Sequence, residues 1–149
     1  MSSFADPIRA LEERLGHRFK DRDLLLRALT HLSYANEQPP ALDNDGLAFL
    51  GDAVLSLLVA EHLWETAGAE PVGILTPRRA SVVSGENLAR WAEALELGPM
   101  LRLGRGEELT GGRMKRSVLA TAFEAILAVV YLEGGLAVAR VVVKRLAVW

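Results

Sequence analysis

One carboxylate, Asp52, lies within an apolar stretch in which leucine and valine recur at every third or fourth position. That spacing, seen at Leu47, Leu50 and Val54, predicts a long helix with one buried face. Because burying an unpaired carboxylate is costly, we expect Asp52 to meet a cation, a metal ion or hydrogen-bond donors. A glycine inside a helix costs roughly 1 kcal/mol relative to alanine. Gly51 therefore indicates that another backbone approaches this helix closely.

Helices are also predicted before this stretch. Asp6, which is followed by proline, has the character of a helix N-cap, and Asp21 or Asp23 begins a second helix. His31 is expected to cap a helix or brace the core rather than to do chemistry. The two prolines within residues 37–42 predict a loop.

Further helices are predicted after it. The central helix is expected to end at Trp64 or Thr66, and residues 68–73 are expected to form a turn. Thr76 with the proline that follows it has the pattern of a new helix N-terminus. One apolar stripe then continues to Leu95, which predicts a single helix over that range.

The last helical region is interrupted by two glycines. Gly134 and Gly135 are expected to break a helix, and residues 136–149 to form a final amphipathic one. No convincing strand alternation is present. The sequence therefore predicts an all-α fold of about six or seven helices.

Composition limits the class of protein. A chain of 149 residues fits one domain, residues 1–149, and can bury about 70% of its unfolded surface. The longest apolar runs, 53–60 and 125–132, fall short of the roughly 20 residues that a membrane span needs. We see no secretory signal and no cysteine, so a cytoplasmic protein without disulfides is expected.

The charges are unevenly distributed. The net charge of −2 argues against coating nucleic acid by charge alone, but basic residues, mostly arginine, concentrate between positions 78 and 116. Guanidinium groups suit phosphate well, although a solvated surface is the simpler explanation. The residues predicted to bind RNA are Arg78, Arg79, Arg105, Arg113, Lys115 and Arg116.

Two segments resemble the ribonuclease III family. Residues 49–55, Phe-Leu-Gly-Asp-Ala-Val-Leu, are similar to the end of its signature Asn-Glu-x-Leu-Glu-Phe-Leu-Gly-Asp. Residues 117–125 resemble its helix Ser-Ile-Leu-Ala-Asp-x-x-Glu-Ala. The resemblance covers roughly residues 8–147 and implies the family's endonuclease domain, without the double-stranded-RNA-binding domain that often follows it.

The resemblance also implies a catalytic site. Family members hydrolyse phosphodiesters in double-stranded RNA with Mg²⁺ or Mn²⁺ held by carboxylates. Asp52 and Glu124 match two of the catalytic, metal-binding residues. Ala48 and Thr121 replace two other carboxylates, and Val72 stands where the family has a further acidic residue. We therefore expect weak metal binding, if any, and impaired or lost hydrolysis.

Other interpretations remain open. Asp52 and Glu124 are alternatively a buried pair kept for fold geometry and satisfied by Asn44, Asn87 or an arginine. The resemblance implies a homodimer in which Phe49 enters the partner, whereas in a monomer Phe49 would lie in its own core. Three functions compete: a non-cleaving protein that binds duplex RNA, an active small ribonuclease III, and a structural subunit of a ribonucleoprotein.

Overall fold

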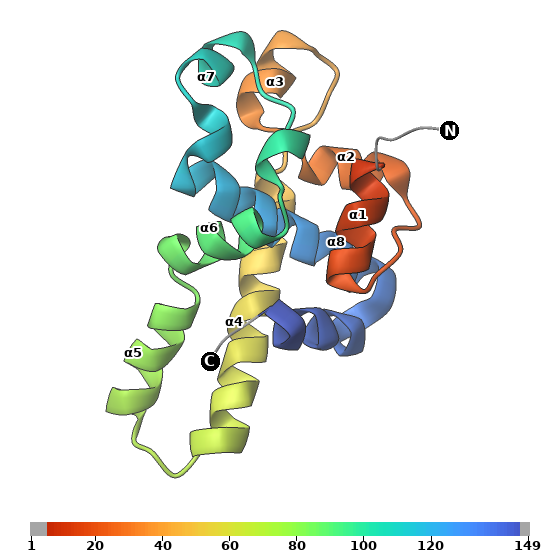
Figure 1. Ribbon diagram of the computed structural model, residues 1–149. Helices are drawn as coiled ribbons and strands as arrows, with labels where there is room; N and C mark the ends of the chain where they lie inside the picture. Colours follow the sequence, from red (N-terminus) through yellow and green to blue (C-terminus); the bar gives the residue numbers. More distant parts are fainter. Residues whose placement is uncertain (1–5, 147–149) are drawn as a thin grey trace.

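The computed structural model describes residues 6–146, and the expected end of the last helix, 147–149, lies outside them. The described residues form eight α-helices and two short 3₁₀ helices (Figure 1). Their bounds are α1 Pro7–Leu15, α2 Arg22–Ala28, α3 Leu32–Glu37, α4 Asp45–Ala67, α5 Val72–Val82, α6 Gly85–Ala94, η1 Gly98–Met100, α7 Arg105–Leu109, η2 Gly112–Met114 and α8 Arg116–Leu146. Among residues 6–146 the only β pairing is one isolated bridge between Thr30 and Arg102. The all-α prediction is therefore confirmed, with one or two helices more than expected.

Two long helices, α4 and α8, cross at the centre of the core. A β-carbon added to Gly51 on α4 would lie only 1.8 Å from the backbone oxygen of Glu124 on α8. The two helices can approach this closely because glycine has no side chain at the contact. Buried side chains from both helices, with those of α6, form most of the hydrophobic core around the crossing.

Three helix starts follow the expected capping chemistry. The side chains of Asp6, Asp21 and His31 each accept a hydrogen bond from a backbone N–H in the first turn of the following helix. These bonds satisfy donors that have no partner inside the helix. His31 accepts from the Ser33 N–H through Nδ1, at 3.1 Å, so its predicted capping role is confirmed.

The prediction for the segment after the central helix was wrong. A single helix beginning at Thr76 was expected, but α5 begins at Val72 and contains Pro77 in its interior. A second helix, α6, then begins after Ser84, whose hydroxyl accepts from the Asn87 N–H. The Ser84 cap begins a new helix with a different direction, so the residues of the predicted apolar stripe lie on two separate helices.

The predicted break near the end of the chain is confirmed. Gly135 has φ 77° and ψ −177°, a conformation that L side chains rarely adopt, and it kinks α8. The segment after the kink turns back toward α4 (Figure 1). There Arg140 donates two hydrogen bonds to Glu61, at 2.5 and 3.1 Å, which tie the two helices together.

Glu133 holds the loop between α1 and α2 (residues 16–21) against α8, a role that the sequence analysis did not find. Its side chain accepts hydrogen bonds from the backbone N–H groups of Lys20 and Asp21, and it lies 2.8 Å from Nε2 of His17. The pKa of Glu133 is lowered: burial alone would raise it, but these hydrogen bonds outweigh that effect.

By length and composition alone, α4 and α8 are apolar enough to cross a membrane. In each helix 44% of the most apolar window is buried inside the protein. The buried part of each helix belongs to the core that the two helices share.

Gly51→Ala should destabilise the fold, because the added methyl group would overlap the Glu124 backbone and force the helices apart. Such overpacking typically costs about 1–3 kcal/mol. Gly85→Ala is the matched control, since a β-carbon there meets nothing within 4 Å. Denaturant unfolding measures both variants, and equal stability of the two would contradict the proposed role of Gly51.

Candidate functional site

Asp52 and Glu124 meet where α4 and α8 cross. Asp52 follows Gly51 directly, and Glu124 supplies the backbone oxygen that Gly51 faces. Asp52 is exposed, whereas Glu124 is half-buried, and their side chains share a hydrogen bond. The structure therefore brings the two carboxyl groups of the predicted site together.

The two carboxyl groups hold a proton between them at neutral pH. The pKa of Glu124 is raised from 4.5 to about 8, first by burial, then by the hydrogen bond to Asp52, and then by the negative charge of Asp52. At pH 7 the Glu124 carboxyl is therefore protonated and can donate to the Asp52 carboxylate. The amides of Asn44 and Asn87 donate elsewhere, to the carbonyls of Ala28 and Val82.

The residues around this pair do not fit a firmly held divalent ion. Ala48 is buried and has no ligand atom. The Thr121 hydroxyl donates a hydrogen bond to the Ser117 carbonyl, at 2.9 Å, one turn earlier in the same helix. Within residues 6–146 no group of three or more acidic, histidine or cysteine side chains is placed to hold a metal ion.

Val72 does not join the pair within one chain. It is the first residue of α5, across the turn that follows the far end of α4 (Figure 1). Asp52 lies near the opposite end of α4, so about 20 Å of helix separates it from that turn. Val72 is also 73% exposed. Its side chain therefore contributes nothing to the Asp52 and Glu124 site of its own chain.

Half of the predicted RNA-binding residues form ion pairs with carboxylates. Arg113 pairs with Glu108, Lys115 with Glu107 and Arg116 with Glu86. Arg113 in addition donates from Nη1 to the carbonyls of Gly98 and Leu101, at 3.0 and 2.6 Å. Its guanidinium thus braces the turn at η1, a use that spacing along the sequence does not reveal.

The other three cations differ. Arg78 and Arg79 are exposed on α5, and Arg105 is exposed at the start of α7. Among the described residues, 6–146, none of these three guanidinium groups has an ion pair within 4.0 Å. Free guanidinium groups can bind phosphate without first breaking a contact.

An apolar stripe remains uncovered on α4. Phe49 is 83% exposed, so the alternative that placed it in its own core is wrong. Leu57 and Trp64, further along the helix, are also exposed. Spacings of seven and eight residues put all three on one side of a helix. The sequence analysis missed Leu57 and Trp64 because α4 is apolar on more than one face.

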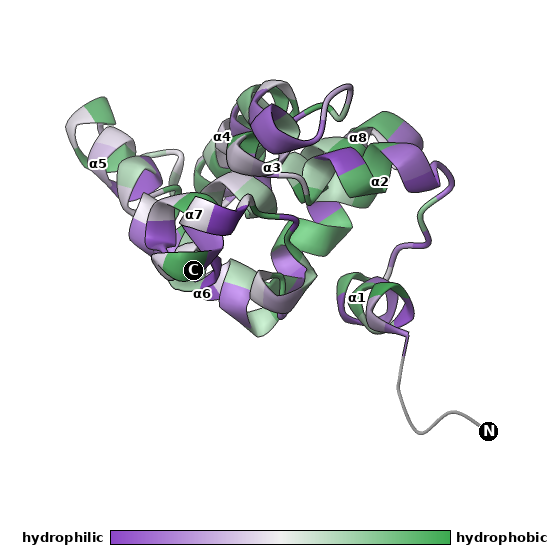
Figure 2. Cartoon of the chain, turned by 90° about the horizontal axis from the view of Figure 1, so that it is seen from above, coloured by the Kyte–Doolittle hydropathy of each residue, from purple (hydrophilic) through white to green (hydrophobic). Residues whose placement is uncertain are grey.

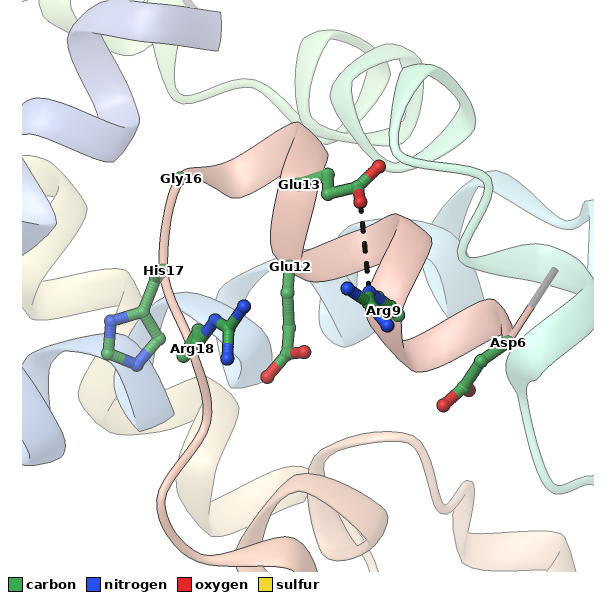
Figure 3. A pocket seen from close by; sticks show the side chains of 7 residues that line it. All are labelled: Asp6, Arg9, Glu12, Glu13, Gly16, His17 and Arg18. Carbon is green, nitrogen blue, oxygen red and sulfur yellow. Dashed lines mark ion pairs between the residues drawn. The ribbon is translucent and has the colours of Figure 1, made fainter.

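A hollow of about 440 Å³ beside α1 is not part of this site. Figure 3 shows charged side chains of both signs around it, with an ion pair between Arg9 and Glu13. Glu12 already accepts a hydrogen bond from the Phe19 N–H. The mixture of charges favours no one class of ligand. The hollow is lined by Asp6, Arg9, Glu12, Glu13, Gly16, His17 and Arg18.

Glu124→Gln should remove a pH dependence of stability. Since the pKa of Glu124 is about 8 in the folded protein and 4.5 as its ordinary value, the folded state binds an extra proton between these pH values. This stabilisation is complete below pH 4.5 and is lost as the pH rises through 8. The Tm of the wild type should therefore fall relative to that of Glu124→Gln across this interval.

Thermal unfolding at intervals from pH 4.5 to pH 9 would check this, with Glu93→Gln, an exposed glutamate on α6, as the control. The control should follow the wild type. Parallel curves for the wild type and Glu124→Gln would show that Glu124 titrates normally.

Comparison with known proteins identifies the family that this chain resembles. A ribonuclease-III-like family model matches residues 21–148. Ribonuclease 3 from Caldanaerobacter subterraneus is 48% identical over 137 residues, which cover 91% of this chain and 60% of that protein. Ribonuclease 3 from Geobacter metallireducens is 50% identical over 129 residues, or 85% of this chain and 52% of that one.

The fold agrees as well. The nuclease domain of ribonuclease III from Campylobacter jejuni superposes with a TM-score of 0.87 at 39% identity, covering 93% of this chain and 94% of that one. The chain spans a little more than half the length of the curated relatives and matches a nuclease domain nearly end to end. With a family model across most of its length and the same helical fold, this chain belongs to the ribonuclease-III-like family.

Proposed function

We propose that this protein binds double-stranded RNA as a homodimer in RNA processing or regulation, and that its hydrolytic activity is impaired or lost. The observation that carries the proposal is the isolated carboxyl pair: Asp52 and Glu124 meet at the helix crossing, with Ala48 and Thr121 beside them in place of further carboxylates. The protein would thus bind the family's substrate class, double-stranded RNA, but would have lost most of the family's hydrolytic activity.

Impaired hydrolysis follows from the charge of the site. Cleaving a phosphodiester requires an activated water and stabilisation of the charge that builds on phosphate, and in this family a divalent ion supplies both. Removing even one outer-shell partner of a metal ligand typically lowers affinity or activity about 10–100-fold. Two missing ligands should lower it further. A Mg²⁺ or Mn²⁺ ion would bind weakly at most.

Binding to duplex RNA rests on family membership and on the free cations. Ribonuclease 3 relatives cover nearly the whole chain. Arg78, Arg79 and Arg105 present guanidinium groups that no carboxylate neutralises in the described part of the chain. With a net charge of −2 the protein should bind weakly at physiological salt, because few phosphates are neutralised. A cytoplasmic location belongs to the same proposal.

The homodimer rests on the uncovered α4 stripe. Phe49, Leu57 and Trp64 are large apolar side chains left exposed on one helix, and contiguous exposed patches of this kind mark interaction sites. A crystal structure of the Campylobacter jejuni domain shows structural flexibility in its region involved in dimer formation. A second copy of this chain is therefore the proposed partner, with Phe49 as the buried anchor.

Ala48→Glu combined with Thr121→Asp should restore Mg²⁺-dependent cleavage of a labelled RNA duplex, while the wild type shows little or none. Side chains three or four apart on a helix have β-carbons about 5–6 Å from each other, so the new carboxylates would lean toward Asp52 and Glu124. Either single change should recover much less, because residues that form one site act together. The double variant should be less stable without Mg²⁺ and be stabilised by it.

Adding Glu124→Gln to the double variant is the control, and it should abolish the restored cleavage. A wild type that already cleaves, at a rate that Glu124→Gln abolishes, would instead favour an active small ribonuclease III. A folded double variant that neither binds Mg²⁺ nor cleaves would show that the surroundings of the pair have diverged too far.

Arg78→Ala with Arg79→Ala should weaken binding to duplex RNA and flatten its salt dependence. Each lost phosphate contact lowers the slope of log K against log salt by about 1. Arg9→Ala with Arg22→Ala removes the same charge from α1 and α2, away from α5, and should change the slope little. Fluorescence anisotropy at several salt concentrations measures both. Equal losses would point to charge alone, and no binding at all would favour a structural subunit.

Phe49→Ala should weaken the dimer. Truncating a buried anchor residue commonly costs about 2 kcal/mol or more, which is roughly 30-fold in the dissociation constant. Leu109→Ala is the control, because Leu109 is just as exposed but lies on α7. Analytical ultracentrifugation at micromolar concentration compares them. A Phe49→Ala protein that associates as tightly as the control would place the interface elsewhere.

A further inference from the structure

Helix α5 has few contacts with the rest of the protein: it packs on α4, and at its C-terminal end the Val82 carbonyl accepts a hydrogen bond from the Asn87 amide of α6. All of its residues are described, and none of them is buried. It packs mainly on the second half of α4, and both views place it at the edge of the molecule (Figures 1 and 2). Hydrophilic and hydrophobic residues are mixed along it (Figure 2). Segments with few buried apolar contacts open locally at low free energy.

The packing between α5 and α4 is also incomplete. A hollow of about 200 Å³ lies between them, lined mostly by apolar side chains. Its walls therefore lack part of the dispersion contact that a filled core provides. Pro77 weakens α5 from within, because it has no N–H to donate to the carbonyl four residues earlier. The lining residues are Ala60, Leu63, Trp64, Val72, Leu75, Thr76 and Arg79.

The hollow is continuous with the uncovered stripe of α4. Trp64 belongs to both, since it lines the hollow and is 71% exposed on the side that carries Phe49. Val72, the first residue of α5, also lines the hollow and is exposed. A protein partner that covers Trp64 would therefore also restrict the movement of α5.

We propose that α5 is an arm that opens locally in a single protomer and is fixed in place when a second copy covers the α4 stripe. The arm carries Arg78 and Arg79, so assembly would also fix the two free cations in position for RNA. This inference rests on the proposed homodimer and adds a coupling to it. If dimerisation has already ordered α5, RNA binding no longer bears the entropy cost of ordering it. The coupling is reciprocal, so bound RNA would strengthen the dimer by the same factor.

Hydrogen exchange measured by mass spectrometry tests the arm directly. The wild type at a concentration where it is dimeric is compared with Phe49→Ala, with sedimentation recorded on the same samples. Amides of residues 73–83 should exchange about tenfold or more faster in the monomeric variant. Amides of residues 118–130 in α8, which lie in the core, should exchange equally slowly in both.

A second variant should hold α5 against α4 in the monomer. Ala60→Leu adds a larger side chain to the wall of the hollow and should slow exchange in residues 73–83 in the Phe49→Ala background. Ala137→Leu, on an exposed face of α8, makes the same change elsewhere and should not. At equal monomer concentration, RNA affinity should rise with Ala60→Leu and stay unchanged with Ala137→Leu.

The outcomes separate the arm from the dimer. If sedimentation shows that the wild type is a dimer and Phe49→Ala a monomer, equal exchange of residues 73–83 in the two overturns the coupling and leaves the dimer standing. If the wild type is a monomer at every concentration, the proposed homodimer fails and the coupling fails with it. Slow exchange of α5 in the monomeric variant, comparable to that of α8, also overturns the arm.

Discussion

The approach of α4 to α8 at Gly51 determines most of what this protein can do. A backbone oxygen of Glu124 occupies the space that any larger residue at position 51 would need. Close approach brings the side chains of Asp52 and Glu124 into contact, and it lets the apolar faces of both helices form one core. The same contact therefore supports the fold and creates the candidate site, so the two cannot be separated by a change at this position.

The chemistry of the site follows from what surrounds that contact. Two carboxyl groups in contact, one of them half-buried, repel as anions, and without a cation the least costly arrangement is to share a proton. Further carboxylates would make a divalent ion the better solution, but Ala48 and Thr121 supply none. This balance of charges is the reason for proposing that the protein binds RNA with little or no cleavage.

The periphery contrasts with this rigid centre. Within α8, Glu133 accepts hydrogen bonds from backbone N–H groups of the loop between α1 and α2, and Arg140 donates two hydrogen bonds to Glu61 on α4. Helix α5 is tied to α6 at its C-terminal end by the hydrogen bond from the Asn87 amide to the Val82 carbonyl, and its two arginines without an ion pair in the described residues, Arg78 and Arg79, lie along its exposed length. The rigid part of the protein is thus the crossing of α4 and α8. The less firmly held part is α5, which is where we propose that a partner or an RNA phosphate binds.

The sequence alone determined the all-α class, the first two helix starts, the kink at Gly135 and the close approach at Gly51. Each depends on local chemistry, namely helical periodicity, a capping side chain or the absence of a β-carbon, which is legible from neighbouring residues. Its resemblance to a known family was sufficient to pair Asp52 with Glu124. It failed at Thr76, where a local capping pattern competed with a start at Val72.

Only the tertiary structure decided how far apart the remaining residues lie and which charges are already used. Arg113 and Arg78 look alike in sequence, yet one braces the turn at η1 and the other is free. Val72 is separated from Asp52 by most of α4, and Phe49 is exposed although its helix contributes buried residues to the core. These outcomes depend on contacts between residues distant in the chain, and no local pattern encodes such contacts.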